Sequence, residues 1–186
     1  MIAPLSLSNV LTVLVALLCL WTMTPQARGG VLRIWRLAIP ACFSAVQALV
    51  LLAGVFEATF EHDAEWLAAL VLGGVAGRMR GWTMPVVVDQ MRGLVKLPRA
   101  SDGWLTACAL VALSAIDFTS AWLEDPVGEP QHVAAAAALC AGYISCRALS
   151  LIVRSVYVPG AKTTRPVATT ANFDCGTPLM VGVYHM

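Results

Sequence analysis

Long apolar stretches recur along this chain, and their length matches the thickness of a lipid bilayer. A helix needs about 20 consecutive, mostly apolar residues to cross the hydrocarbon layer. The stretches of this kind are Leu5–Thr24, Leu37–Phe56, Trp66–Met79, Gly103–Leu123 and Val133–Val153. The chain is 59% hydrophobic and 12% charged, whereas soluble domains are typically about 45–50% apolar and about 25% charged. The sequence therefore predicts an all-α fold, an integral membrane bundle of five transmembrane helices within residues 1–158.

Two of these stretches have an alternative interpretation. The first is long enough for a secretory signal peptide, but no Lys or Arg precedes it and no clean cleavage motif follows it, which favours a retained helix. The third, Trp66–Met79, is short and contains three glycines. It spans a bilayer if the charged residues on both sides reach the two interfaces, and a re-entrant segment is the alternative. Residues 159–186 are polar and irregular, which predicts a flexible cytoplasmic tail.

Charged residues are sorted between alternate connections. Eleven of the twelve basic residues close or follow the first, third and fifth stretches, and the twelfth is Arg147. The connections after the second and fourth stretches hold acidic residues and no Lys or Arg. Because basic connections stay cytoplasmic, this pattern predicts a protein of the bacterial inner membrane with its amino terminus outside and its carboxyl terminus inside. All six tryptophans lie near the ends of stretches, as expected for side chains that favour the interface.

The longest basic connection, residues 77–100, carries five of the basic residues. These are Arg78, Arg80, Arg92, Lys96 and Arg99. Two short Val-rich runs, Met84–Val88 and Leu94–Leu97, flank the polar sequence DQMRG, which predicts a small β-hairpin. The basic residues either only fix the topology or also contact anionic lipid headgroups or a cytoplasmic partner. Asp89 and Asp102 lie among them, and we expect both carboxylates to neutralise neighbouring arginines.

A resemblance to known proteins rests on this part of the chain. A glycine-bearing span closes with GGVAGRMRG, an extended piece MPVVVDQMRGLV follows, and LPRASDGW opens the next span. The pattern covers roughly Leu70 to Asp117 and resembles uncharacterised bacterial multi-spanning membrane proteins of the CcdC-like group. The resemblance implies a small helical membrane protein with a polar loop between its middle spans, and it implies no particular activity.

Two ionisable residues, Asp117 and Arg147, lie inside apolar stretches and are candidates for a function. Each costs about 2.5–3.5 kcal/mol to insert into hydrocarbon, so each is expected to face protein or water. Three arrangements remain open. The two side chains form a structural pair or polar network, or each is satisfied separately, or they serve transport or proton relay.

Small residues predict close contacts between helices. Gly73 and Gly77 are four residues apart, and a second small-residue row contains Ala138 and Gly142. Such rows let helix backbones approach closely in a membrane. We expect them to serve packing within the bundle, with contact to another subunit as the alternative.

No motif for catalysis, cofactor or metal binding occurs in the chain. It lacks dinucleotide, Walker, zinc-protease and hydrolase signatures, and its cysteines and histidines show no ligand spacing. A net charge of +1 gives no reason to expect nucleic acid as a partner. We therefore expect a non-enzymatic membrane protein without a cofactor, an accessory or scaffold subunit of a membrane assembly. Its expected partners are the lipid bilayer and other membrane-protein subunits or anionic lipid. The alternative is a small carrier or permease that uses Asp117 and Arg147.

Overall fold

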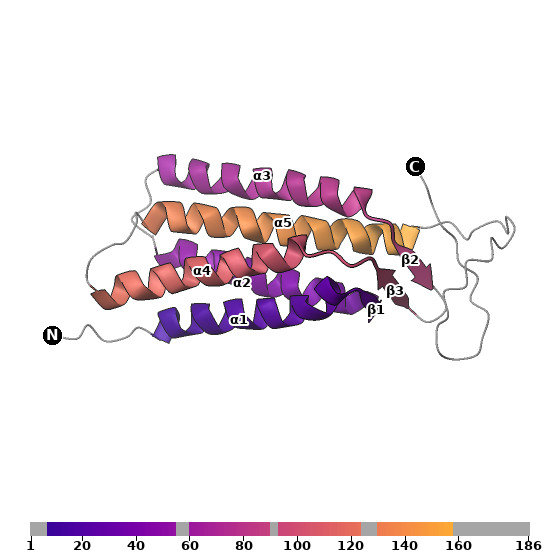
Figure 1. The fold of residues 1–186 in the computed structure, drawn as a ribbon. Helices are drawn as coiled ribbons and strands as arrows, with labels where there is room; N and C mark the ends of the chain where they lie inside the picture. The colour runs from indigo at the N-terminus through magenta and orange to yellow at the C-terminus, as the bar shows by residue number, and fades with distance from the viewer. Residues whose placement is uncertain (1–6, 55–59, 90–92, 124–129, 158–186) are drawn as a thin grey trace, which may run out of the picture.

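The computed structural model of the protein describes residues 7–54, 60–89, 93–123 and 130–157. These residues form a bundle of helices with a small sheet at one end (Figure 1). The helices are α1 (Leu7–Arg28), α2 (Ala38–Gly54), α3 (Phe60–Thr83), α4 (Asp102–Leu123) and α5 (Pro130–Tyr157). The 3₁₀ helix η1 (Ile34–Leu37) leads directly into α2, and the strands are β1 (Gly30–Arg33), β2 (Val87–Asp89) and β3 (Leu94–Leu97). The predicted tail, residues 159–186, lies outside the described residues.

Consecutive helices run in opposite directions, so the bundle has two distinct ends (Figure 1). Helix α5 occupies the centre, since it packs against α2, α3 and α4, while α1 packs against α2 and α4. A buried cluster from α1, α2, α4 and α5 fills the interior, with Met23, Leu110 and Ile144 almost completely buried. Residues at the helix starts favour these boundaries. Asp102 stands in the first turn of α4, where a negative charge suits the helix dipole, and Pro130 is the first residue of α5.

Four of the five described helices are long and apolar enough to cross a membrane. Their apolar segments are Asn9–Arg28, Ile34–Leu52, Asp102–Ser120 and Pro130–Val156. Helix α3 is not among them, because charged residues stand near both of its ends and shorten its apolar part. It is nevertheless one continuous helix of 24 residues that lies along α5 (Figure 1).

The hairpin predicted from the Val-rich runs is confirmed, and it belongs to a larger sheet. Strands β2 and β3 pair antiparallel, with Val88 opposite Val95. The sequence analysis missed β1, which pairs with the other edge of β3 and places Leu32 opposite Val95. The strand order is therefore β1-β3-β2, and the fold is not purely helical. A glycine with a φ of 61°, Gly93, stands directly before β3, where a residue with a side chain would be strained.

The sheet is anchored on the ends of the helices by its inner face. Leu32, Val95 and Leu97 from the strands pack with Leu37 and Leu151 from the helical part in one buried cluster. Since side chains alternate along a strand, the intervening residues face away from the bundle. Those residues are Val31 and Arg33 on β1, Leu94 and Lys96 on β3, and Val87 on β2. The sheet therefore covers one end of the bundle, and its outer face carries Arg33 and Lys96 among apolar residues.

Glycines bring α3 and α5 into backbone contact. A Cβ atom at Gly73 would lie 2.0 Å from the carbonyl oxygen of Leu139, and one at Gly77 would lie 2.2 Å from that of Tyr143. On the other helix, a Cβ at Gly142 would lie 2.3 Å from the carbonyl oxygen of Leu70. Ala138, the remaining member of the predicted small-residue row, is fully buried in α5. The described residues thus use this row for packing inside the bundle.

We expect Gly77→Ala to destabilise the protein by about 1–3 kcal/mol, as overpacking typically does. The added methyl group would meet the backbone of α5, which cannot move aside as a flexible side chain can. Gly30→Ala is the matched control, because a Cβ atom there meets nothing within 4 Å. Thermal unfolding of both detergent-solubilised variants checks the expectation. Equal stability of the two would contradict the contact between α3 and α5.

Candidate functional site

A buried arginine organises the end of the bundle that carries the sheet. Arg147 lies on α5, and only 3% of its surface is exposed. Its Nε stands 3.3 Å from the Oδ2 atom of Asp102, at the start of α4. Its Nη2 donates to the sulfur of Met84 at 3.6 Å. The guanidinium is therefore held by an ion pair on one side and by a polarisable sulfur on another.

The carboxylate of Asp102 receives two further groups on the same oxygen. The hydroxyl of Tyr143 donates to Oδ2 at 2.8 Å, and the Nε of Arg80 donates to it at 3.3 Å. We call Asp102, Arg147, Tyr143 and Arg80 the Asp102 network. Its members come from α3, α4 and α5, so a single oxygen atom ties three helices together at one depth. The expectation that Asp102 neutralises neighbouring arginines is confirmed.

The network needs a glycine beside it. A Cβ atom at Gly103 would lie 2.7 Å from the Nη1 atom of Arg147, so any larger residue would push the guanidinium away. The second oxygen of Asp102, Oδ1, is buried and has no hydrogen-bond partner among the described residues. The carboxylate therefore keeps one acceptor position unused, while its other oxygen collects two cations and a hydroxyl.

A second arginine closes the end of α3. The Nη1 atom of Arg154 donates to the carbonyl oxygens of Gly81 and Met84, both at 2.8 Å, and to that of Trp82 at 2.9 Å. The last carbonyl groups of a helix have no partners within the helix. Arg154 supplies such a partner from α5, and its positive charge also suits the negative end of the α3 dipole.

Asp117 lies far from this network. It follows Asp102 by 15 residues on the same continuous helix, which corresponds to about 22 Å along the axis. Asp102, not Asp117, is the carboxylate that pairs with Arg147. The structure therefore does not bring the two candidate residues together. The sequence did contain a signal for the true partner. Asp102 stands at the start of one span and Arg147 in the last part of the next, antiparallel span, so the two lie at similar depths.

A polar pair that the sequence analysis did not single out lies closer to Asp117. Gln47 on α2 is completely buried, and its side-chain amide donates to the hydroxyl of Ser114 on α4. Ser114 in turn donates to the backbone oxygen of Leu110 at 2.9 Å. The Oε1 atom of Gln47 has no partner in the described part of the chain. Asp117 stands three residues beyond Ser114, and so one helical turn further along α4.

The basic residues predicted as lipid or partner contacts have different environments. Arg78 on α3 and Arg99 after β3 are exposed, and Lys96 is exposed on the outer face of the sheet. Arg80 belongs to the Asp102 network, while Arg92 lies outside the described residues. Two further exposed arginines lie nearby that the sequence analysis did not include in this set, Arg33 at the end of β1 and Arg36 in η1.

The described residues contain no group of three or more His, Cys, Asp or Glu side chains that could hold a metal ion. Their five cysteines are free. Comparison with protein-family models, with curated proteins and with solved structures found no match to this chain. The Asp102 network holds charge in place, because its cations and its hydroxyl are directed at one carboxylate oxygen.

We expect Asp102→Asn to destabilise the protein by about 3 kcal/mol, the loss typical when one member of a buried ion pair is removed. Arg147 would keep its charge without a carboxylate. The double variant Asp102→Asn, Arg147→Met should recover most of this loss, since no buried charge then remains. Asp117→Asn is the matched control on the same helix and should change stability much less. Thermal unfolding in detergent measures all three, and an Asp102→Asn variant as stable as the control would refute the role of the network.

Proposed function

We propose that this protein is a non-enzymatic subunit of a membrane assembly, in which the sheet end of the bundle docks a cytoplasmic partner. The observation that supports this proposal is the anchored sheet. Its inner face is buried against η1 and α5, and its outer face carries Arg33 and Lys96 on two neighbouring strands. A fixed sheet with basic residues on its outer face and two edge strands suits recognition of another protein.

The interior of the bundle supports the same proposal. Arg147 forms an ion pair with Asp102, and Arg80 pairs with the same carboxylate. A carrier that uses Arg147 would need this guanidinium to face a substrate path. The small-residue row, which could have bound another subunit, is instead occupied by the contact between α3 and α5. Surfaces that remain open to a partner include the sheet and the outer side of α3, where Leu72 and Met79 are each 66% exposed.

The proposed placement is the bacterial inner membrane, with all five helices crossing it and the sheet on the cytoplasmic side. In the described residues, the sheet end holds most of the basic residues, whereas Glu65 stands with His132 at the opposite end. The positive-inside preference therefore points the sheet toward the cytoplasm. Helix α3 would cross with the help of α5, because its glycine face is covered by that helix and its outer side is apolar.

Cysteine labelling tests this placement. We expect Ala64→Cys, near the start of α3, to react with a membrane-impermeant maleimide on intact cells whose outer membrane has been opened. We expect Ser101→Cys, at the sheet end, to react only after the inner membrane is permeabilised, and both native positions are exposed. The unmodified protein is the control for its own six cysteines. The opposite labelling pattern would show that the topology is inverted. Labelling of both sites while the inner membrane is intact would show that α3, which separates them, does not cross it.

Charge reversal on the sheet tests the partner. We expect Lys96→Glu to remove a stoichiometric companion that migrates with the tagged wild-type protein on a native gel after gentle detergent extraction. Arg78→Glu reverses an equally exposed basic residue on α3 and should leave that companion in place. Thermal unfolding of both variants shows whether the fold is intact.

A wild-type protein that migrates only as a monomer or homo-oligomer would overturn the proposal. The carrier would then be the better hypothesis, since the buried Gln47–Ser114 pair provides polar groups inside the bundle, one helical turn from Asp117. Uptake that is lost in Asp117→Asn at unchanged expression would support that second function.

A further inference from the structure

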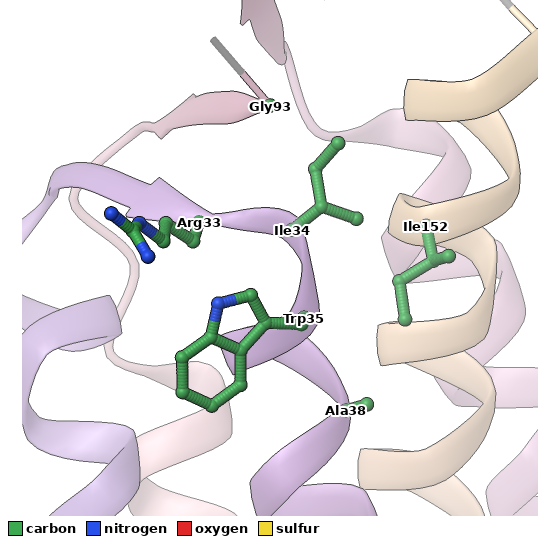
Figure 2. A pocket seen from close by; sticks show the side chains of 6 residues that line it. All are labelled: Arg33, Ile34, Trp35, Ala38, Gly93 and Ile152. Atoms are coloured by element: carbon green, nitrogen blue, oxygen red, sulfur yellow. The ribbon is translucent and has the colours of Figure 1, made fainter.

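A hollow lies beside the sheet, between the start of α2 and the end of α5. It is lined by Arg33, Ile34, Trp35, Ala38, Gly93 and Ile152 (Figure 2). The guanidinium of Arg33 lies on one side, and the indole nitrogen of Trp35 stands on the part of its ring that is nearer to Arg33. Ile34, Ala38 and Ile152 form the opposite, apolar side. The hollow is therefore amphipathic, with hydrogen-bond donors at one side and aliphatic carbon at the other.

The position of the hollow along the helices matches the boundary of a bilayer. The apolar segment that contains α2 begins at Ile34, so Arg33 is the last residue before it. The apolar segment of α5 ends at Val156, one turn beyond Ile152. Arginine and tryptophan both favour the headgroup level, where a charged or polar tip is wet and the rest is buried. Ile34, Ala38 and Ile152 would then lie at the level of the first acyl carbons.

The charge around the hollow favours an anion. In the described residues, Arg33 forms no ion pair, and its side chain is exposed. Arg36 adds a second exposed guanidinium, whose carbon stands 5.7 Å from the centre of the Trp35 ring. None of the six residues that line the hollow is acidic. A phosphate group would therefore meet hydrogen-bond donors here.

We propose that this hollow binds one anionic phospholipid of the cytoplasmic leaflet. The phosphate accepts hydrogen bonds from the guanidinium of Arg33 and from the indole N–H of Trp35, a pairing that suits a planar guanidinium. One acyl chain lies against Ala38 and Ile152. The apolar side distinguishes a lipid from free phosphate, which has nothing to place there. The proposal rests on the membrane placement proposed above, but not on a protein partner.

Native mass spectrometry of the full chain, released from detergent micelles, tests the site. Phosphatidylglycerol and phosphatidylcholine are added at equal concentration. We expect the wild-type protein to retain one phosphatidylglycerol in preference to phosphatidylcholine. Arg33→Gln should lower that bound fraction about fivefold, the effect of one basic residue at a membrane surface. Arg28→Gln removes the same charge from an exposed position outside the hollow and should leave binding unchanged.

A second variant separates the site from general charge. Ala38→Phe keeps every arginine but fills the apolar side, and it should also lower phosphatidylglycerol binding, with thermal unfolding as the check that it folds. Glycerol 3-phosphate, which carries the headgroup chemistry without acyl chains, should not compete. Equal losses in Arg33→Gln and Arg28→Gln, or full competition by glycerol 3-phosphate, would overturn the proposal. Reconstitution into lipid vesicles distinguishes the two proposals. A protein that inserts into vesicles but does not prefer phosphatidylglycerol would refute this site alone. A protein that does not insert would refute the membrane placement.

Discussion

The positive charge of Arg147 inside the bundle is the constraint on which the arrangement of three helices depends. A guanidinium in an apolar environment must be paired, since inserting it alone costs about 2.5–3.5 kcal/mol. The pairing fixes the start of α4, because Asp102 has to stand at the level of Arg147 with only a glycine after it. It also fixes the end of α3 through Arg80, and the rotation of α5 through Tyr143, which lies one turn from Arg147 on the same face.

Helix α3 depends on this arrangement more than its neighbours do. By composition it is the least suited of the five described helices to stand alone in a bilayer, and among them it packs chiefly on α5. Glycines at four-residue spacing remove the side chains that would separate the two backbones, and Arg154 satisfies the carbonyl groups at its end. Backbone contact and the Arg154 cap act between α3 and α5, and the Asp102 network joins both of these helices to α4. The apolar outer side of α3 is therefore held in a defined orientation, ready for lipid or for a partner.

Sequence patterns predicted what depends on local order along the chain, and missed what depends on pairing across it. The five helices, the hairpin and the glycine contact follow from runs of apolar residues, Val-rich runs and four-residue spacing, all within one segment. Strand β1 has only four residues, and GVLR has no meaning as a strand until β3 is placed beside it. The sequence likewise did not identify the partner of Arg147. Asp117 was the candidate, because it lies within an apolar stretch. Asp102, at the edge of that stretch, looked like a loop residue, although matching depths would have favoured it.

The arginines at the sheet end divide into buried and exposed ones. Arg147 is buried and paired with Asp102, and this pair holds helices together. Strands from two connections far apart in sequence meet over η1 and α5, and Arg33 and Arg36 beside them are exposed. Arg33 therefore belongs to two surfaces at once: it lies on an edge strand of the sheet, and its side chain lines the hollow. The proposed lipid would fix the edge of the sheet at which we propose that a partner docks, and it would thereby couple the membrane surface to recognition of that partner.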